Sequence, residues 1–235
     1  MRTWCTFPLV LLALALPGGA GEPAPEAEEP TPAPPRTEEG FVPLFPGDSF
    51  EGWQGAIAGY QLDRGVLVSK EDSGGTLLTK KEYADFILRF EFKLSPGGNN
   101  GIALRAPLGG RTSQTGMEIQ VLDDTAEKYK NLQPYQYHGS LYGLVPAKRG
   151  HLKPVGEWNE QEILCQGRHI RVTLNGTVIV DANLDKLGPV GLDGYVHEGR
   201  YRTSGHLGFM GHRSRVEFRN LRIKELPACP AAAKK

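Results

Sequence analysis

Hydrophobic and polar residues alternate along several stretches of the chain, as expected for β-strands that bury one face. The clearest stretch is DFILRFEFKL, residues 85–94, whose alternate positions are large and apolar: Phe86, Leu88, Phe90, Phe92 and Leu94. A second stretch, QTGMEIQVLDD at residues 114–124, places Met117, Ile119 and Val121 on one face and Glu118 and Gln120 on the other. The apolar face predicts core packing. The polar face is either a solvated surface or the lining of a groove.

Turn signals separate the predicted strands. Residues 169–184, HIRVTLNGTVIVDANL, predict a hairpin around Asn175-Gly176, because this pair tolerates the positive φ angles of a type I′ turn. Asn175 also begins an Asn-Gly-Thr glycosylation sequon, although the turn explains the pair without it. In RVEFRNLRIKEL, residues 215–226, the inward phase changes between Phe218 and Leu221, which predicts a β-bulge near Asn220.

These patterns predict an all-β protein. About ten to a dozen short strands follow one another without the alternating strands and helices of a parallel sheet, and the chain contains 30 glycines. A length of 235 residues is enough for one substantial hydrophobic core. We therefore expect two antiparallel sheets packed as a β-sandwich of the jelly-roll type.

The ends of the chain have a different composition. An apolar run from Phe7 to Leu16, preceded by Arg2 and followed by Gly-Gly-Ala, predicts a signal peptide over residues 1–20. Residues 21–39 are rich in Pro, Ala and Glu and predict a disordered linker. The folded domain is predicted over residues 40–226, with a flexible tail at residues 227–235. The expected location is secreted or periplasmic, with no membrane partner after cleavage of the signal.

Charge and cysteine content narrow the range of partners. The 27 Lys and Arg residues balance the 27 Asp and Glu residues, so the chain lacks the basic excess of a nucleic-acid-binding protein. After cleavage, two cysteines remain, Cys165 in a strand pattern and Cys229 in the tail, and we expect both as free thiols. No cysteine or histidine cluster has the spacing of a zinc site.

A neighbouring strand supports the groove interpretation of Glu118 and Gln120. NNGIALRAP, residues 99–107, places Ile102 and Leu104 on one face and Ala103 and Arg105 on the other. Pairing Leu104 with Ile119 would bury the apolar residues of both strands and place Arg105 opposite Glu118. A slip by two residues would keep the faces and change the partners. The small residues Gly101 and Ala103 would leave room for a ligand.

Six segments of the chain resemble, in order, the 3-keto-disaccharide hydrolase domain family. They are GFVPLFPGDSFEGW, LLTKKEYADFILRFEFKLSPGGNNGIALRAP, TGMEIQVLDD, YQYHGSLYGLVPAKRGHLKPVGEWNEQEI, VTLNGTVIV and GHLGFMGHRSRVEFRNLRIKEL. The resemblance covers roughly residues 40–226. It implies a concanavalin-like jelly roll and a hydrolase that is exported.

The resemblance also implies a substrate, namely a disaccharide or glycoside whose C3 hydroxyl has been oxidised to a ketone by a separate oxidoreductase. The ketone acidifies the C2 proton, and removal of that proton leads to expulsion of the C1 oxygen. Such chemistry requires a base near C2, a cation or donor near the C3 oxygen and an acid near the leaving group.

By this resemblance, the expected catalytic residues are Glu118 as base, Arg105 as stabiliser of the enolate oxygen, and His212 as acid or orienting partner. An exchange of roles between Glu118 and His212 stays open. The expected substrate-binding residues are Gln120, Asp123, Tyr137, Trp158 and Lys148. No metal is assigned, but a divalent cation held by Glu118, Asp123 and His212 is an alternative to Arg105.

The chain departs from the family pattern at three positions. Met210 and Arg213 stand where Gln and Gly are usual, and Asn100 stands where Ser is commoner. Met210 removes a hydrogen-bonding group two residues before His212, on the same strand face. These departures bear on the choice of substrate more than on the fold.

Two other classes of function stay open. EIQVLD resembles the Glu-x-Asp-x-x-Glu motif of laminarinase-type glycosidases, with Gln120 and Asp123 substituted. The fold also serves lectins and carbohydrate-binding modules, for which the candidate aromatic platform is Tyr135, Tyr137, Tyr142 and Trp158.

The remaining polar candidates have ordinary structural interpretations. The loop PAKRGHLKP, residues 146–154, is interpreted as a solvated basic loop that could also close over a substrate; its charged residues are Lys148, Arg149, His151 and Lys153. Four other histidines are expected at turns or on the surface: His138, His169, His197 and His206.

Overall fold

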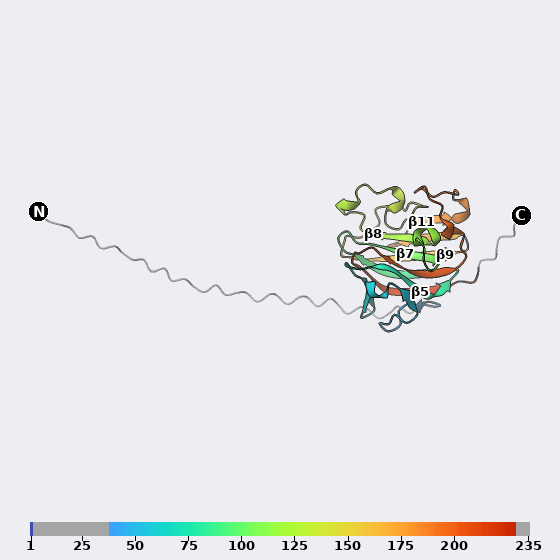
Figure 1. The fold of residues 1–235 in the computed structure, drawn as a ribbon, viewed down its shortest axis with the longest axis horizontal. Helices are drawn as coiled ribbons and strands as arrows, with labels where there is room; N and C mark the ends of the chain where they lie inside the picture. The colour runs from blue at the N-terminus through green and yellow to red at the C-terminus, as the bar shows by residue number, and fades with distance from the viewer. Residues whose placement is uncertain (2–37, 229–235) are drawn as a thin grey trace. The chain divides into compact units, whose positions relative to one another are not determined.

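The computed structural model describes residue 1 and residues 38–228, which form an eight-stranded and a five-stranded antiparallel sheet (Figure 1). The predicted signal peptide, most of the predicted linker and Cys229 lie outside the described residues. The eight-stranded sheet contains, in spatial order, β11 (Thr177–Asn183), β10 (His169–Leu174), β9 (Trp158–Gln166), β6 (Phe86–Leu94), β13 (Val216–Glu225), β4 (Val66–Ser69) and β3 (Tyr60–Asp63), with β1 (Val42–Pro43) paired to β13. The five-stranded sheet contains β2 (Trp53–Gly55), β5 (Gly75–Tyr83), β12 (Gly205–Gly211), β7 (Asn99–Ala106) and β8 (Met117–Leu122).

Among the described residues, helical structure is confined to short segments between the strands. It consists of α1 (Thr112–Thr115) and the 3-10 turns η1 (Ile57–Gly59), η2 (Glu127–Tyr129), η3 (Pro134–Gln136), η4 (Leu184–Lys186) and η5 (Glu198–Tyr201). In the part of the chain that the structure describes, no helix is both long and apolar enough to cross a membrane. The connections that carry η2, η3, η4 and η5 lie at the same end of the domain, above the strands in Figure 1.

The core lies between the two sheets and is built from the predicted inward positions. On β6, the five alternate apolar residues from Phe86 to Leu94 are all at most 3% exposed. On β8, Met117, Ile119 and Val121 are at most 1% exposed and belong to the same cluster. The prediction of an all-β, two-sheet antiparallel sandwich is therefore confirmed.

The predicted hairpin and bulge are also confirmed. Between β10 and β11, Asn175 and Gly176 adopt φ angles of +48° and +82°. The Asn175 side-chain amide donates to the His151 carbonyl and to the Asn159 side chain, so the sequon nitrogen is used within the fold. On β13, the register with β6 shifts between Arg219 and Arg222, and Asn220 has a φ of +52°.

The predicted register between β7 and β8 is wrong by two residues. Ile102 pairs with Ile119, and Ala103, not Arg105, pairs with Glu118. The slip keeps Ile102 in the core and Glu118 on the outer face, because side chains alternate with a period of two. The alternation therefore fixes the face correctly, whereas the predicted partner of Glu118 is incorrect.

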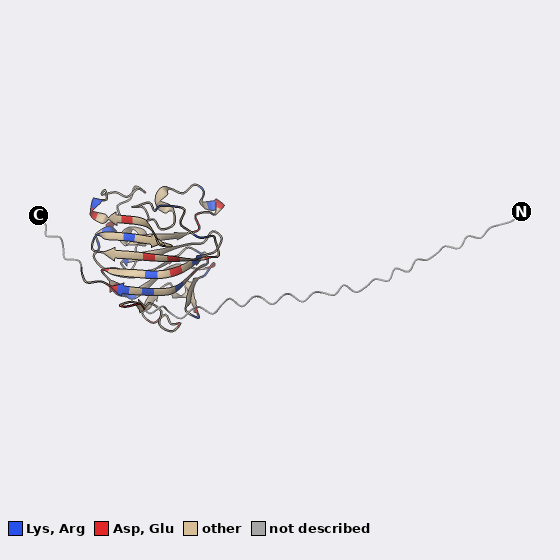
Figure 2. Ribbon diagram, turned by 180° about the vertical axis from the view of Figure 1, so that it is seen from behind, with Lys and Arg blue, Asp and Glu red and all other residues tan. Residues whose placement is uncertain are grey.

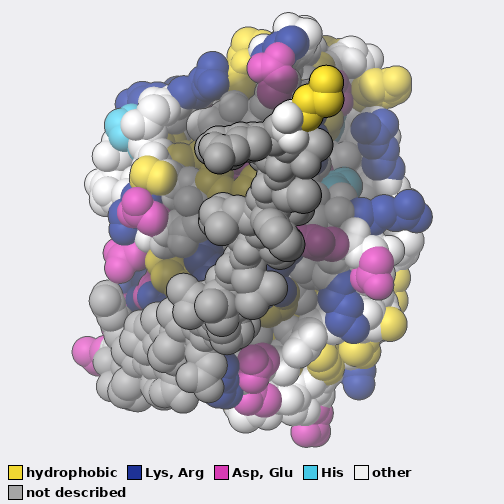
Figure 3. All heavy atoms as spheres, turned by 90° about the vertical axis from the view of Figure 1, so that its left-hand side faces the viewer, with side chains coloured by type: hydrophobic (Ala, Val, Ile, Leu, Met, Phe, Trp, Pro, Cys, Tyr) yellow, Lys and Arg dark blue, Asp and Glu magenta, His cyan; other side chains and the backbone are white. Residues whose placement is uncertain are grey.

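The outer faces of the two sheets differ. Basic and acidic residues mark several strands of the eight-stranded sheet in the ribbon of Figure 2. Where described residues are visible from the side in Figure 3, basic and acidic side chains are interspersed. The outer face of the five-stranded sheet is partly covered, because the segment after β8 folds back along that strand. There, the Gly139 and Tyr142 amides donate to the carbonyls of Gln120 and Glu118.

Candidate active site

A pocket of about 290 Å³ lies on the outer face of the five-stranded sheet. Its floor comes from β7, β8 and the end of β12, and its walls come from the segment around α1 and the segment that carries η2 and η3. The lining residues are Asn99, Arg111, Ser113, Glu118, Gln120, Leu122, Tyr129, Leu132, Gln136, Tyr142, Met210 and His212. The structure thus brings together three of the predicted site residues, Glu118, Gln120 and His212.

Glu118 reaches the centre of this pocket by lying across Gly101 of the neighbouring strand. A Cβ atom at Gly101 would stand 2.2 Å from Glu118 Oε1, so only glycine leaves space for the carboxylate. Ala103 pairs with both Glu118 and Gly208, and Ile102 pairs with Phe209, so Gly101 is aligned with Met210 of β12. Since neighbouring strands are about 4.8 Å apart, the carboxylate lies roughly one strand closer to β12 than its own backbone.

Burial gives Glu118 an unusual pKa. The residue is 4% exposed. Removal from water raises the pKa of its carboxyl from 4.5 to about 7, and the opposing attraction of the Arg111 guanidinium is weaker. A carboxyl that titrates near neutral pH can exchange a proton with a substrate at physiological pH.

His212 follows β12 and lines the same pocket as Glu118. Its side chain is exposed at the rim, but the surrounding protein removes part of its hydration and lowers its pKa below the usual 6.5. Burial therefore shifts the pKa values of Glu118 and His212 in opposite directions. A carboxyl and an imidazole whose pKa values are both perturbed in one pocket are typical of acid–base sites.

Arg111 is a site residue that the sequence analysis missed. It immediately precedes α1, and its guanidinium lies 5.8 Å from the centre of the Tyr195 ring and acts electrostatically on Glu118. The residue lies in an irregular loop where no periodicity applies, so no sequence pattern indicates its position. Arg111, and not Arg105, is thus the arginine that lines the pocket together with Glu118.

Arg105 itself has a structural role. It is 1% exposed, and its guanidinium donates to the carbonyls of Ala84, Gly167 and Arg202 and to the Asp85 carboxylate at 3.0 Å. All of these partners lie outside the pocket. The expectation that Arg105 faces Glu118 is wrong, because the register differs and because the backbone at Arg105 has a φ of +47° that redirects the side chain.

Asp123 is also turned away from the pocket. One carboxylate oxygen accepts the Gly97 amide at 2.7 Å, and the other accepts the amide and hydroxyl of Thr125. The alternative metal site made of Glu118, Asp123 and His212 is therefore not assembled. Within residues 38–228, no three His, Cys, Asp or Glu side chains are grouped as metal ligands.

The other predicted binding residues are dispersed. Tyr137 packs under Arg149, whose guanidinium is 3.6 Å from the ring centre, and Trp158 is covered by Arg219 at 3.9 Å. Lys148 lines a different hollow beside Asp124 and His151. Of the aromatic platform, Tyr142 lines the pocket, and Tyr135 contacts it edge-to-face.

Polar contacts hold the floor and wall of the pocket in place. The Gln120 amide donates to the Asn99 side chain at 3.1 Å, and the Gln136 amide donates to the Tyr142 hydroxyl at 3.1 Å. Because Gln120 is 5% exposed, this contact restricts its orientation. Gln120 can present its carbonyl oxygen to a hydroxyl group of a ligand, whereas the Gln136 carbonyl oxygen accepts the Gln133 backbone amide.

Of the four histidines expected at turns or on the surface, three are buried. The His138 ring accepts the Leu122 amide and stacks on Phe92, and burial lowers its pKa to about 4. His197 is 1% exposed and lies between the Ser113 carbonyl and the Asp193 carboxylate, where it anchors the loop before η5 to α1. The third is His206. Their burial depends on contacts between distant segments, which local sequence does not reveal.

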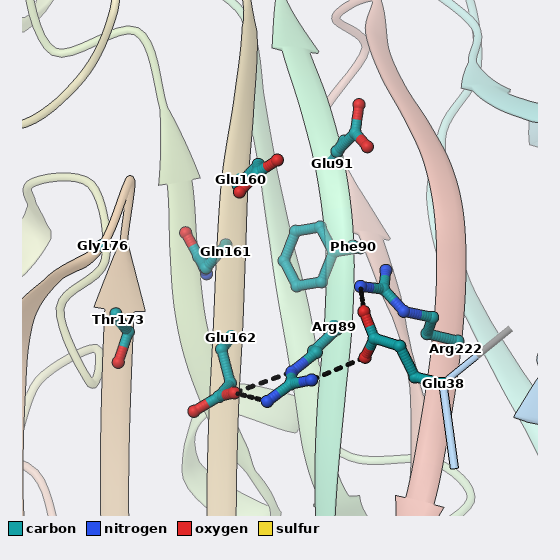
Figure 4. Close-up of a pocket in the computed structure, with 10 residues that line it drawn as sticks. All are labelled: Glu38, Arg89, Phe90, Glu91, Glu160, Gln161, Glu162, Thr173, Gly176 and Arg222. Atoms are coloured by element: carbon teal, nitrogen blue, oxygen red, sulfur yellow. Dashed lines mark hydrogen bonds and ion pairs between the residues drawn. The ribbon is translucent and has the colours of Figure 1, made fainter. Parts of the chain in front are cut away.

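A second pocket lies on the outer face of the eight-stranded sheet (Figure 4). Its charges are paired with one another. Glu38 bridges Arg89 at 2.5 Å and Arg222 at 2.8 Å, which lowers the Glu38 pKa to about 2, and Arg89 also contacts Glu162. Because these charged groups already form ion pairs with one another, they are less available to bind or react with a ligand than the residues of the Glu118 pocket.

Similarity to known proteins assigns the family of this two-sheet antiparallel β-sandwich. Residues 40–224 match the family described as the 3-keto-alpha-glucoside-1,2-lyase-like domain. The chain belongs to this family, which confirms the resemblance noted in the sequence.

Individual relatives agree with this assignment. A 3-keto-disaccharide hydrolase from Bacteroides thetaiotaomicron is 24% identical over an alignment of 230 residues. The match covers 80% of this chain and 79% of the relative. A crystal structure of a candidate glycosyl hydrolase from Parabacteroides distasonis is 30% identical, with a TM-score of 0.71 over 79% of this chain and 99% of that one. A second structure from the same organism is 26% identical, with a TM-score of 0.68 over 80% and 95% of the two chains.

Proposed function

We propose that this domain cleaves the glycosidic bond of 3-keto-disaccharides or 3-keto-glycosides by proton abstraction at C2 and elimination of the C1 oxygen. The observation that carries the proposal is the buried Glu118 carboxyl, with a pKa of about 7, in a pocket that it shares with Arg111 and His212. The name of the Bacteroides relative, 3-keto-disaccharide hydrolase, supports the substrate class.

The residues fit the three requirements of the elimination. Ionised Glu118 removes the C2 proton, and its raised pKa makes it a stronger base than an ordinary carboxylate. The electron pair moves onto the C3 oxygen, whose negative charge Arg111 stabilises. As the C1–C2 double bond forms, the bond from C1 to the leaving oxygen breaks, and His212 donates a proton to that oxygen. Addition of water across the double bond then completes a net hydrolysis.

The two pKa values define the pH range in which the pair can act. Base catalysis by Glu118 requires an ionised carboxyl, and acid catalysis by His212 requires a protonated ring. The active state, with ionised Glu118 and protonated His212, holds one proton between the two groups, and so does the pair in which both groups are neutral. States with one proton are most populated between the two pKa values, so the active state is too. Activity should therefore peak between the lowered His212 pKa and about pH 7.

The pocket favours elimination over a conventional retaining glycosidase. A retaining mechanism requires a second carboxyl about 5–5.5 Å from the first. Glu118 is the only acidic residue among the described residues that line the pocket, and the motif's other candidate, Asp123, is bonded to Gly97 and Thr125. A ketone substrate needs only one carboxylate.

The substrate's ketone must come from a sugar C3 oxidoreductase that acts before this enzyme. The apolar run at residues 7–16 supports export, so both steps would take place in the periplasm or outside the cell.

The test compares a 3-keto-disaccharide with its unoxidised parent, using the protein from residue 21 onward together with its Glu118→Gln and His212→Asn variants. Cleavage of the keto sugar alone, with loss of activity in Glu118→Gln, supports the proposal. Cleavage of the parent sugar would instead indicate a glycosidase. Sugar binding without cleavage of either compound would indicate a lectin-like module.

A further inference from the structure

A second hollow adjoins the Glu118 pocket, and His212 lines both. The other lining residues of this hollow are Ser73, Gly74, Gly75, Gly211 and Arg213. We propose that it is the subsite for the leaving group, and that it binds a hydroxyl-bearing sugar rather than an aromatic aglycone. This assignment rests on the proposed function and extends it to the second half of the substrate.

The order of the strands places the two hollows next to each other across the five-stranded sheet. The Glu118 pocket extends over β8, β7 and β12, and the second hollow lies where β12 meets β5, the next strand across the sheet. A substrate with its ketone-bearing ring beside Glu118 and Arg111 would thus direct its second ring toward β5. The oxygen that joins the rings would lie near His212, where the elimination requires an acid.

The floor of the second hollow is kept open by glycine and fixed from beneath by a tyrosine. Gly75 pairs with Gly211 across the two strands, and a Cβ atom at Gly74 would stand 2.7 Å from the Gly211 carbonyl oxygen. The Tyr60 hydroxyl donates to the Gly75 carbonyl at 2.8 Å and accepts the Gly211 amide at 2.8 Å. Tyr60 is 3% exposed, so these contacts hold the floor rigidly from the core side.

The chemistry of the lining favours a hydroxyl-rich ligand. The lining offers the Ser73 hydroxyl, peptide groups, the His212 imidazole and the Arg213 guanidinium, and no Phe, Tyr or Trp side chain of the described residues contributes to it. An aromatic aglycone would find no Phe, Tyr or Trp side chain to pack against, whereas several sugar hydroxyls can accept hydrogen bonds from the five N–H donors of an arginine.

Arg213 is the residue that should favour a sugar over an aromatic aglycone as the leaving group. It is exposed at the hollow with a φ of +54°, a conformation that favours glycine. Within residues 38–228, its guanidinium forms no ion pair or side-chain hydrogen bond. Its donors are therefore free to bind a ligand in the hollow.

The test uses Arg213→Gly, which removes the guanidinium and places the favoured residue at this φ, so the fold should be retained. The substrates are a 3-keto-disaccharide and the corresponding 4-nitrophenyl 3-keto-glycoside. We expect the ratio of their kcat/KM values, disaccharide over nitrophenyl, to fall about tenfold, as for loss of a hydrogen bond to a charged group. The matched control is Arg64→Gly, another exposed arginine with positive φ, in the turn between β3 and β4, which should leave the ratio unchanged.

The outcomes separate the subsite from the proposed function. If the unmodified protein cleaves both substrates and Arg213→Gly leaves the ratio within about twofold of the original, the subsite assignment is wrong and the proposed function stands. An equal fall on both substrates would also overturn it, because a general defect would explain that result. If the unmodified protein cleaves neither substrate, both proposals fail.

Discussion

The Glu118 carboxylate occupies the space that a side chain at Gly101 would require. Its Oε1 atom, Cδ and Cγ are the three nearest heavy atoms to a Cβ built on Gly101, at 2.2, 2.9 and 2.9 Å. The two residues lie on neighbouring strands, and Gly101 pairs not with Glu118 but with Gln120. The position of the proposed base therefore depends on the absence of a side chain on the adjacent strand.

This relationship predicts that Gly101→Ala inactivates the enzyme with little effect on its fold. The φ angle of Gly101 is outside the left-handed region, so alanine suits the backbone, and the methyl group meets only Glu118 among its nearest neighbours. We expect kcat for a 3-keto-disaccharide to fall at least about tenfold, since small displacements of catalytic groups are costly. Steady-state kinetics and thermal unfolding provide the measurements.

A double mutant tests whether the effect acts through Glu118. In the Glu118→Gln background, the additional Gly101→Ala change should cost little further activity, because residues in contact are not additive. If the activity losses of the two single variants add in full, Gly101→Ala lowers activity by a route other than displacement of Glu118.

The raised pKa of Glu118 predicts that this carboxyl, which activity requires, destabilises the folded protein once it is ionised. The folded protein holds this proton up to about pH 7, whereas the unfolded chain loses it near 4.5, so the unfolded state binds fewer protons in between. The free energy of unfolding therefore falls as the pH rises from about 4.5 to about 7. Glu118→Gln removes this loss and should stabilise the protein at about pH 8 by up to about 3 kcal/mol.

Urea unfolding at about pH 5 and about pH 8 measures this effect. Glu127→Gln is the control, because Glu127 is exposed and lies in η2. A Glu118→Gln protein that shows the same stability difference from the unmodified protein at both pH values would contradict the burial argument.

Arg111 should influence both the rate and its pH dependence. Removal of the cation in Arg111→Gln should lower kcat by roughly 10²- to 10³-fold, the typical cost of losing a donor to a developing oxyanion. Because the Arg111 charge lowers the Glu118 pKa, its removal should raise that pKa further, and the limb of the kcat/KM profile assigned to Glu118 should move to higher pH. Arg111→Lys should restore part of the rate, and an unshifted profile in Arg111→Gln would contradict the electrostatic contact.

Arg105 should behave as a structural residue. Arg105→Ala would leave Asp85 buried without its guanidinium partner and would free three backbone carbonyls. Breaking a buried pair in this way costs about 3–5 kcal/mol, so we expect a large fall in the unfolding free energy. Chemical unfolding measures this change. A variant with unchanged stability but lost turnover would instead indicate that Arg105 takes part in the reaction.

The contrast between Arg105 and Arg111 shows how far sequence patterns determine this site. The alternation in β8 placed Glu118 and Gln120 on the correct face, whereas His212, predicted within a strand, directly follows the end of β12 at Gly211. Strand alternation cannot fix the register to better than two residues, because a slip of two preserves every face. It also gives no information on Arg111, which reaches the pocket from a loop. The buried histidines were missed for the same reason, since His197 is held by Ser113, distant in sequence.

The direction of proton transfer between substrate, Glu118 and His212 predicts the shape of a pH profile. The intact pair gives a bell-shaped profile whichever group is the base, because both assignments involve the same number of protons. In His212→Asn, only Glu118 titrates in this range, so the two assignments separate. With a 4-nitrophenyl 3-keto-glycoside, whose leaving group departs without protonation, the variant should retain measurable activity.

If Glu118 is the base, kcat/KM of His212→Asn on this substrate rises with pH through about 7 and then levels off, because ionisation activates the carboxylate. If Glu118 is instead the acid and His212 the base, the variant loses proton abstraction, and any residual rate falls or stays flat over the same range. The disaccharide should lose about 10²- to 10⁴-fold in the variant, as expected when its oxygen must leave without a proton donor. A rise on the nitrophenyl substrate together with this larger loss on the disaccharide would identify Glu118 as the base and His212 as the acid.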